Sequence, residues 1–586
     1  MLLKCSIFNL LPQLIEKLRK KEALDLKLTG AQILIEILKQ EGVDTVFGIT
    51  GGAIIDIFDE LAKTDIKHIM ARHEQGAVHA ADGYARAKRK VGVCLVTSGP
   101  GATNTVTGLT SAYMDSIPLV VLTGQVPTSL IGNDAFQEAD IVGITRPCTK
   151  HNYLVKSIED LARTVKEAFY IARSGRPGPV LVDLPKDIIQ AREDYKPLPP
   201  PSLKSYRPTY RPNKKQLNKA LKLIQEAKKP VIFAGGGVIL SEASVELTHF
   251  ARKLNAPVTG SLMGLGAFPG IDRLWLGMLG MHGTYQANMS VGACDLLIGV
   301  GVRFDDRVTG KVDTFAPHAR IIHIDIDPTS IRKNIMVTVP IVADCKATLT
   351  ELNRLMDAEG LTLNPENNKR WLDQIAEWKS AFPLAYEQKD IIKPQYVIER
   401  LYELTEGKAI ISTEVGQNQM WAAQYYHFDR PNAFLTSGGL GCMGFGLPAA
   451  IGAQVARPKE LVIDIAGDGS IQMNLQELAT AIQYKLPVKI IILNNRYLGM
   501  VRQWQELFYE KRYAATDIQD GPDFVKLAES YGGVGLRATR PEEVAPVLKE
   551  GLGIPKLVIM EFVVDREECV YPMVPAGAPI TEMLLV

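Results

Sequence analysis

Apolar residues along the chain follow two patterns that alternate. Short apolar runs, such as Val93 to Thr97 and Leu461 to Ala466, are typical of strands buried on both faces of a parallel sheet. Between such runs, apolar residues recur at helical spacing, as in the segment that starts at Thr29 and ends near Gly42. This alternation predicts an α/β protein whose domains are mainly parallel sheets flanked by helices.

One strand-helix-strand unit is especially clear. The strand Leu461 to Ala466 leads into a tight Gly467 to Ser470 turn, and helical spacing follows it until Pro487. The second strand, Val488 to Leu493, ends in two asparagines. Because the carboxyl ends of adjacent parallel strands lie side by side, residues that follow the two strands can meet.

Asp468 and Asn495 follow these two strands. A carboxylate and an amide oxygen suit a magnesium ion that takes its other ligands from phosphate. Gly467 and Gly469 allow close backbone approach, and the amides that open the next helix can hold an anion. The pattern predicts a magnesium-diphosphate clamp. The alternative is an ordinary turn with a polar pair at a strand end.

Length and proline distribution predict the domain organisation. A chain of 586 residues is long enough for several domains. Prolines crowd the segment between Asp187 and Pro212, which predicts a semi-rigid linker without regular structure. The tail Val570 to Pro579 is too rich in Pro and Gly for a packed element and would suit a mobile cap. We expect an extension (1–27), a first domain (28–190), a linker (191–212), a middle domain (213–365), a polar, helical linker that ends near Lys393 (366–392) and a last domain (393–586).

Composition narrows the class of protein. With 46% hydrophobic and 22% charged residues, the chain is typical of a globular enzyme, and a net charge of +1 argues against a nucleic-acid partner. The seven cysteines are scattered without a CxxC pair, and no apolar stretch is long enough to span a bilayer. We expect a cytoplasmic protein. The basic extension is interpreted as a short helix, with a transit peptide as the alternative.

Candidate chemistry also appears in the first and middle domains. Glu74 stands where a strand becomes a helix, close in sequence to a glycine-rich loop, Ser98 to Asn104. Taken alone, Glu74 would be a solvated charge. In the middle domain, Arg303 and Asp325 belong to two strand ends, which suits a dinucleotide with a cation on pyrophosphate and a carboxylate on ribose. The alternative is that these are loop charges on a structural domain.

The motifs together resemble one enzyme family. The GDG and NN pattern looks like the diphosphate motif of thiamine-diphosphate enzymes. Nearly everything from Thr29 onward strongly resembles acetohydroxyacid synthase, also called acetolactate synthase. The motifs that carry this resemblance are GITGGA (48–53), RHEQGA (72–77), GQVP (124–127), DAFQE (134–138), LGMHGTYQAN (279–288) and GVRFDDRVTG (301–310).

The resemblance implies a reaction and its partners. Pyruvate would be decarboxylated, and the hydroxyethyl-thiamine carbanion would add to a second pyruvate, giving 2-acetolactate, or to 2-oxobutyrate, giving 2-aceto-2-hydroxybutyrate. Both products belong to branched-chain amino-acid biosynthesis. The implied cofactors are thiamine diphosphate, Mg²⁺ and a structural FAD. A homodimer or tetramer with a small regulatory subunit is implied, with each active site built from two chains. A pyruvate oxidase or related carboligase, and a non-catalytic cofactor-binding protein, are the alternatives.

The resemblance also implies roles for individual residues. Glu74 would bond N1′ of the aminopyrimidine and promote proton transfer from the thiazolium carbon. Asn418 replaces the usual histidine and would still donate to phosphate. Thr50 replaces a proline that is common in the family. The other implied positions are catalytic Gly52, Gln137 and Lys186; cofactor-binding Arg176, Arg303, Asp325, Gln417, Gly441, Met443, Gly469 and Ser470; substrate-channel Ala53, Pro127, Met500 and Trp504; and metal-binding Asp468, Asn495 and the main-chain carbonyl of Tyr497.

Overall fold

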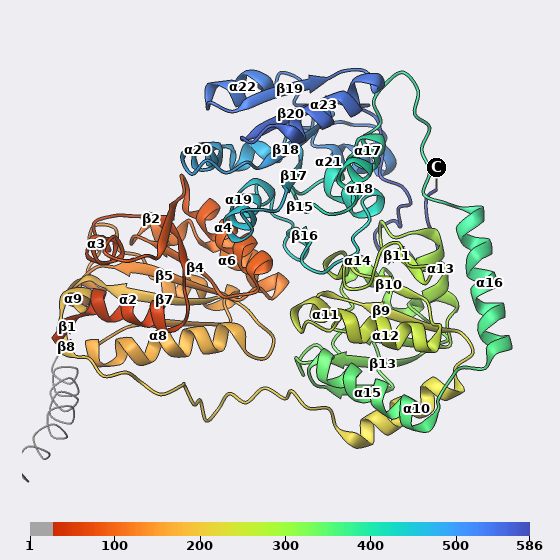
Figure 1. Cartoon of the computed structure of the whole chain (residues 1–586), viewed down its shortest axis with the longest axis horizontal. Coiled ribbons are helices and arrows are strands. Elements are labelled where there is room, and N and C mark those ends of the chain that lie inside the picture. The colour runs from red at the N-terminus through yellow and green to blue at the C-terminus, as the bar shows by residue number, and fades with distance from the viewer. Residues whose placement is uncertain (1–26, 586) are drawn as a thin grey trace, which may run out of the picture. The chain divides into compact units, whose positions relative to one another are not determined.

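A computed structural model describes residues 27–585, in which helices and strands alternate along the chain (Figure 1). These residues divide into two units, one formed by 27–81 and 91–205 and the other by 82–90 and 206–585. The predicted N-terminal extension lies outside the described residues, apart from Lys27. Three six-stranded sheets contain parallel neighbours throughout, which confirms the predicted α/β class. No helix within residues 27–585 is both long and apolar enough to cross a membrane.

The first unit is built on one parallel sheet. Helices α2 and α8 pack together on one face of it, where their apolar side chains meet those of the strands (Figure 1). In spatial order the strands are β3 (Lys67–Met70), β2 (Thr45–Ile49), β4 (Gly92–Val96), β5 (Leu119–Gln125), β7 (Val180–Pro185) and β6 (His151–Leu154). The helices are α2 (Gly30–Gln40), α3 (Ile55–Leu61), α4 (Glu74–Lys88, which ends in the second unit), α5 (Pro100–Thr103), α6 (Val106–Asp115), α7 (Ile141–Thr145), α8 (Ile158–Arg173) and α9 (Lys186–Gln190).

Local hydrogen bonds explain where α2 begins and how the segment after α9 is ordered. Thr29 caps α2, because its hydroxyl accepts from the Gln32 amide at 3.2 Å while the Gln32 side chain accepts from the Thr29 amide at 3.0 Å. The prediction of a linker without regular structure is wrong at its start. Residues 187–190 belong to α9, and β8 (Arg192–Asp194) pairs antiparallel with β1 (Lys27–Thr29). The prolines begin only at Pro197, so the backbone amides of β8 remain available for pairing.

The middle sheet of the second unit is covered on both faces. Alternate residues of its central strand point to opposite sides, so Ile232 packs toward α10, α12 and α15 while Phe233 packs toward α13 and α16. The strand order is β11 (Trp275–Met278), β10 (Val258–Gly260), β9 (Pro230–Ala234), β12 (Leu296–Val300), β13 (Arg320–Asp325) and β14 (Val339–Val342). The helices are α10 (Lys214–Glu226), α11 (Gly236–Leu240), α12 (Ser244–Leu254), α13 (Tyr285–Ala293), α14 (Asp306–Thr309), α15 (Cys345–Glu359) and α16 (Pro365–Ala381). Helix α16 ends before the predicted Lys393, because Pro383 follows closely.

The last sheet carries the predicted clamp. Its strand order is β16 (Phe434–Leu435), β15 (Ile410–Thr413), β17 (Val462–Gly467), β18 (Lys489–Asn494), β20 (Val558–Val563) and β19 (Val534–Ala538). The helices are α17 (Pro394–Thr405), α18 (Gln417–Tyr425), α19 (Gly446–Ala456), α20 (Leu478–Gln483), α21 (Gly499–Phe508), α22 (Phe524–Ser530) and α23 (Pro541–Gly553).

The predicted helix between β17 and β18 is interrupted. Two 3₁₀ turns, Ile471–Met473 and Leu475–Glu477, precede the short α20. Asn474 separates them with a non-helical backbone, and its side-chain amide donates to the Gly444 carbonyl at 2.7 Å. This tertiary hydrogen bond holds the chain out of a continuous helix.

The C-terminal tail is a packed segment, so the prediction that it forms no packed element is wrong. Val570, Met573 and Val574 are buried, and the Val574 amide donates to the Met281 carbonyl at 2.8 Å. Proline prevents regular secondary structure here but leaves the Val570 side chain free to pack in the apolar core beside the last sheet.

Candidate active site

Asp468 and Asn495 meet at the carboxyl edge of the last sheet, as their spacing predicts. Strands β17 and β18 are parallel neighbours whose register pairs Gly467 with Leu493, so the two residues follow adjacent strand ends. Both side chains are buried, and the backbone amides of Asn495 and Arg496 lie against the Asp468 carboxylate. The geometry therefore brings the Asp468 carboxylate against the backbone of Asn495.

The environment of Asp468 fits a cation. Burial raises the pKa of its carboxyl to about 7, against the opposing effect of the backbone amides around it. Its Oδ1 atom is buried and has no hydrogen-bond partner among residues 27–585. A buried carboxylate oxygen without a partner is costly unless a cation or ligand satisfies it. No cluster of three or more His, Cys, Asp or Glu side chains within residues 27–585 could hold a metal ion. Phosphate oxygens would therefore have to complete the coordination of a cation at Asp468.

The turn after β17 has the close packing that its glycines predict. The Ser470 hydroxyl donates to the Gly467 carbonyl at 3.3 Å, and a Cβ at Gly469 would lie 2.6 Å from the Leu498 side chain. Tyr497 follows β18, and its amide donates to Asn495 Oδ1 at 3.1 Å. The Arg566 guanidinium lies over the Tyr497 ring, 4.4 Å from its centroid. The segment that would offer the Tyr497 carbonyl is therefore firmly placed.

Gln417 and Asn418 do not present free side-chain donors. The Asn418 amide nitrogen donates to the carbonyls of Glu414 and Ile465, at 3.0 and 2.9 Å. Both hydrogens of this amide group are therefore used within the protein, and donation to phosphate stays a prediction that would require one of these bonds to break. The Gln417 side-chain amide is also fully used. Its Nε2 donates to Gln503 Oε1 and to the Glu568 carbonyl, and its Oε1 accepts from Asn495 Nδ2. The backbone amides at the start of α18 remain the groups that would face an anion.

The Gly438 to Phe445 loop, which leads into α19, carries the predicted Gly441 and Met443. Gly441 has a φ of +72°, and Met443 is half-buried. The loop is anchored by Glu414, whose carboxylate accepts from the amides of Gly444 at 2.6 Å and Leu447 at 3.1 Å. Burial raises the pKa of Glu414 and also that of nearby Asp464.

Helix α21 carries the predicted channel residues. Met500 and Trp504 are half-buried and one helical turn apart, so both lie on one side of α21. Trp504 makes an edge contact with Phe508, with 5.9 Å between ring centroids. Half-exposed apolar side chains on one helix face suit the wall of a channel.

In the first unit, Glu74 is the first residue of α4 and is half-buried. Its Oε2 accepts from the Asn104 side-chain amide at 2.9 Å. A Cβ at Gly101 would lie 3.6 Å from Glu74 Oε1, so the glycine-rich segment after β4 adjoins this carboxylate as the sequence suggests. The predicted loop is partly helical, because Pro100–Thr103 forms α5. The structure therefore places Glu74 beside a loop, held by one amide donor.

Three other predicted residues of this unit, Gly52, Ala53 and Gln137, lie on loops, and a fourth, Lys186, opens α9. Lys186 Nζ donates to the Gly52 carbonyl at 3.0 Å. This hydrogen bond joins the start of α9 to Gly52 of the GITGGA segment. Ala53 adjoins Gly124, where an added Cβ would lie 3.0 Å from the Ala53 Cβ. Gln137 has a left-handed backbone with a φ of +57°.

Asp183 supports the loop that contains Pro127 and Gln137. Its buried carboxylate accepts from the Thr123 hydroxyl at 2.7 Å and from Gln125 Nε2 at 2.9 Å. Gln125 in turn donates to the Ala139 carbonyl at 2.9 Å. Burial raises the pKa of Asp183 to about 7, despite these two donors.

The residues predicted to contact a dinucleotide lie in both units. In the first, Arg176 Nε donates to the Ser116 hydroxyl at 2.8 Å. In the second, Arg303 and Asp325 belong to the ends of the adjacent strands β12 and β13, and Asp325 Oδ1 accepts from the Asp327 amide at 2.8 Å. The glycine turn after β9 packs so tightly that a Cβ at Gly235 would lie 2.2 Å from the Gly301 carbonyl oxygen. This close packing and the charged strand ends fit a dinucleotide.

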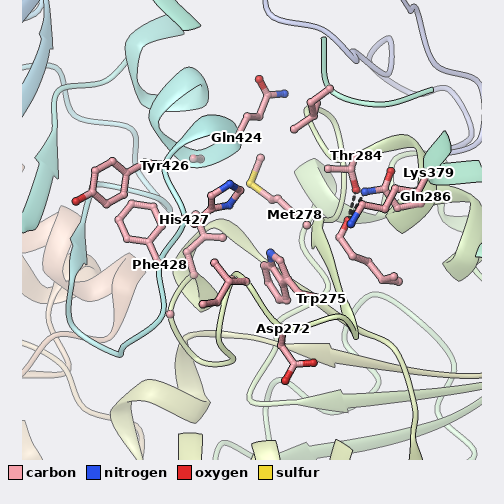
Figure 2. A pocket seen from close by; sticks show the side chains of 18 of the residues that line it. Asp272, Trp275, Met278, Thr284, Gln286, Lys379, Gln424, Tyr426, His427 and Phe428 are labelled. Atoms are coloured by element: carbon pink, nitrogen blue, oxygen red, sulfur yellow. Dashed lines mark hydrogen bonds between the residues drawn. The ribbon is translucent and has the colours of Figure 1, made fainter. Parts of the chain in front are cut away.

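A separate pocket of about 500 Å³ lies in the second unit and is lined by none of the predicted site residues. Figure 2 shows Trp275 and Met278 of β11 facing His427, which follows α18. Lys379, near the end of α16, also lines the pocket.

Comparison with known proteins identifies the family. Models of the thiamine pyrophosphate enzymes match three segments: the N-terminal TPP binding domain at residues 28–144, the central domain at 217–352 and the C-terminal TPP binding domain at 414–562. The chain is 51% identical to the acetolactate synthase large subunit of Haemophilus influenzae over 565 residues, which cover 95% of this chain and 98% of the relative. The chain belongs to the acetolactate synthase family.

Two further relatives agree with this assignment. The acetolactate synthase isozyme 3 large subunit of Escherichia coli is 51% identical, again over 95% of this chain and 98% of the relative. The acetolactate synthase large subunit of Cyanidium caldarium is 46% identical over 571 residues, which cover 95% of this chain and 96% of the relative. The chain is thus a thiamine-diphosphate enzyme, as its sequence motifs predict.

Sequence reasoning missed several side chains around this acetolactate synthase family site. Asn104 ends the glycine-rich segment Ser98 to Asn104, but nothing in the sequence pairs it with Glu74. Glu414 and Asp183 each stand near a strand end in an otherwise apolar region, a signal that could have marked them as buried acids. Gly499 opens α21, where a glycine is unfavourable unless a neighbouring group needs the space. This glycine could have indicated a close contact at the start of α21.

Proposed function

We propose that the chain is an acetolactate synthase, which decarboxylates pyruvate and joins the remaining two-carbon unit to a second 2-oxo acid. With pyruvate as acceptor the product is 2-acetolactate, and with 2-oxobutyrate it is 2-aceto-2-hydroxybutyrate. Carbon dioxide is released once per turnover, and no net oxidation occurs. The observation that carries this proposal is identity of about 50% to acetolactate synthase large subunits across 95% of the chain.

Thiamine diphosphate, when bound, supplies the carbon nucleophile and electron sink that decarboxylation needs. Asp468 and Asn495 would hold Mg²⁺ through side-chain oxygens, with the Tyr497 carbonyl as a further ligand. The turn amides at Gly469 and Ser470 and the start of α18 would hold the diphosphate. The Oδ1 atom of Asp468, which has no partner among the described residues, supports this assignment.

Glu74 would act as the proton-transfer residue. Its carboxylate is half-buried and held by the Asn104 amide, which leaves its second oxygen for the aminopyrimidine ring. The Gly52 backbone would lie by the reacting centre, and Lys186, which donates to its carbonyl, would lie at the mouth of the site. Gln137 would lie near the substrate. Gly441 and Met443 would support the cofactor from the other domain.

FAD would bind through Arg176, Arg303 and Asp325. Its proposed role is structural, because the net reaction transfers no electrons. The acceptor channel would be lined by Ala53, Pro127, Met500 and Trp504. The half-exposed apolar surface of α21 supports this assignment.

The proposed assembly is a homodimer or tetramer that also takes a small regulatory subunit. Several relatives carry the name large subunit, which indicates that those proteins have a smaller partner. Glu74 belongs to the first unit and Asp468 to the second. We propose that the two residues combine across a twofold interface.

A product assay tests the proposed reaction. The purified chain, supplied with thiamine diphosphate, Mg²⁺ and FAD, should convert pyruvate into 2-acetolactate. Added 2-oxobutyrate should yield 2-aceto-2-hydroxybutyrate in competition. Hydrogen peroxide formed in place of acetolactate would instead indicate a pyruvate oxidase. Cofactor binding without turnover of either substrate would indicate a non-catalytic binding protein.

A further inference from the structure

A chain of buried side-chain amides connects the C-terminal tail with Asn495. It begins at Gln503, whose Oε1 accepts from the Val570 amide at 2.8 Å while its Nε2 donates to the Val570 carbonyl at 3.0 Å. A backbone amide can only donate and a backbone carbonyl can only accept. The backbone of Val570 therefore determines which end of the Gln503 amide carries oxygen and which carries nitrogen.

Gln417 is the second member of this chain. Its Nε2 donates to Gln503 Oε1 at 2.9 Å and to the Glu568 carbonyl at 3.0 Å. Both partners accept only, so both hydrogens of the Gln417 amide are used and its Oε1 must point the other way. The orientation set at Val570 is thus passed on to Gln417.

Asn495 is the last member. Its Nδ2 donates to Gln417 Oε1 at 3.0 Å, which places its Oδ1 on the opposite side of the amide. That oxygen accepts from the Tyr497 backbone amide at 3.1 Å and keeps a second lone pair. All three amide side chains are buried, at 3% exposure for Gln417, 5% for Asn495 and 0% for Gln503.

Gly499 leaves the space that this arrangement needs. A Cβ at this position would lie 2.1 Å from Gln417 Oε1 and 2.6 Å from Asn495 Nδ2. Any larger residue would displace the hydrogen bond between these two side chains. The glycine at the start of α21 is therefore explained by the amide pair beside it.

We infer that Gln417 and Gln503 are positioning residues for the metal: they hold Asn495 so that its oxygen, and not its nitrogen, faces the cation site beside Asp468. A nitrogen of an amide group does not coordinate Mg²⁺, so a rotated Asn495 would lose the ligand. Supporting hydrogen bonds of this kind orient metal ligands and typically contribute about 10- to 100-fold in metal affinity. This inference rests on the proposed function, because it assumes a magnesium-diphosphate clamp.

Two neutral variants test the inference without adding a charge near the cation. Gln417→Met removes the acceptor for Asn495 Nδ2 at nearly constant volume. Gly499→Ala keeps Gln417 but displaces its oxygen. Binding of Mn²⁺, used in place of Mg²⁺ with thiamine diphosphate present, would be followed by electron paramagnetic resonance. Both variants should bind Mn²⁺ about 10- to 100-fold more weakly than the wild type.

A matched control separates positioning from general destabilisation. Gln454 is another buried glutamine of the second unit, and its Nε2 donates to the backbone carbonyls of Arg457 and Glu460 at 3.1 Å. Gln454→Met should leave the Mn²⁺ affinity unchanged, even if its thermal unfolding midpoint falls. In Gly499→Ala, saturating Mg²⁺ should restore kcat, because the reacting groups remain in place.

The outcomes distinguish failure of the inference from failure of the proposed function. If the wild type binds Mn²⁺ with thiamine diphosphate and both variants bind it equally well, the positioning role is wrong. If the wild type itself binds no Mn²⁺ under these conditions, the proposed clamp is wrong, and the inference falls with it. Should Gln417→Met fail to fold, Gly499→Ala decides alone, because an alanine is favourable in a helix.

Discussion

The Asn104 side-chain amide donates a hydrogen bond of 2.9 Å to the Glu74 carboxylate. This contact ties the first residue of α4 to the end of the glycine-rich loop after β4. Because Asn104 occupies one carboxylate oxygen, the direction of the other oxygen is restricted. Glu74 is thus presented by two segments that are distant in the sequence.

Replacing Glu74 by glutamine should lower turnover by about 10² or more, because a proton-transfer group is lost. The glutamine carbonyl can still accept from Asn104, so fold and cofactor binding should persist. The measurement is kcat for acetolactate formation, together with thiamine-diphosphate affinity. Glu167→Gln is a matched control, since that side chain accepts from the Tyr153 hydroxyl at 3.1 Å in the same unit. Wild-type turnover in Glu74→Gln would remove this residue from the mechanism.

Asp468→Ala should weaken Mg²⁺-dependent binding of thiamine diphosphate and leave FAD bound. The reason is that the carboxylate is a ligand of the proposed clamp, whereas the residues proposed for FAD are other side chains. Titration with Mg²⁺ at fixed thiamine diphosphate measures the first effect, and flavin absorbance after gel filtration measures the second. Loss of both cofactors together would indicate misfolding and would not support the clamp.

Substitutions at Ala53, Pro127 and Trp504 should reduce sensitivity to sulfonylurea-type inhibitors. The family resemblance places these positions in the channel where such herbicides bind. Each variant should retain measurable acetolactate formation, so that an inhibition constant can be determined. Unchanged inhibition in all three variants would contradict the assignment of the channel.

Mixed dimers test whether each active site is shared between two chains. Homodimers of Glu74→Gln and of Asp468→Ala should be nearly inactive. A mixed dimer with shared sites has one site with both defects and one with neither. After random reassociation of equal amounts, half the dimers are mixed, so roughly a quarter of wild-type activity should return. Demonstrated mixed dimers that stay as inactive as their parents would exclude the shared site.

Asp183 should make the stability of the protein depend on pH. Burial raises its pKa from 3.8 to about 7, so the folded state holds a proton that the unfolded chain releases. The stability contributed by this group is fully present below about pH 4 and is lost as the pH rises through about 7. The shift corresponds to roughly 4 kcal/mol at 1.36 kcal/mol per pKa unit.

The variant Asp183→Asn should remove this contribution to the pH dependence. Asparagine can accept from Gln125 and donate to the Thr123 hydroxyl oxygen, so both contacts persist. Thermal unfolding midpoints at pH 5 and pH 8 should therefore differ less in the variant than in the wild type. The control is Asp65→Asn, at an exposed position of the same unit. An equal pH dependence in Asp183→Asn and wild type would show that Asp183 does not titrate in this range.

The sequence by itself determined the α/β class and the meeting of Asp468 with Asn495. Both follow from local rules, because apolar runs form buried strands and parallel strands place their carboxyl ends at one edge. The same rules marked Glu74 and the loop that ends at Asn104 as neighbours of a ligand-bearing edge. Acetolactate synthase motifs in the sequence were enough to indicate the family.

Only the tertiary structure decided how individual polar side chains are used. Asn418 donates its amide hydrogens to two backbone carbonyls, and Gln417 donates its own to Gln503 and Glu568. The packing of the tail around Val570 was likewise not visible in a segment rich in Pro and Gly. The physical reason is that a hydrogen bond depends on where two distant segments come together, whereas a strand or helix depends mainly on the pattern within one segment.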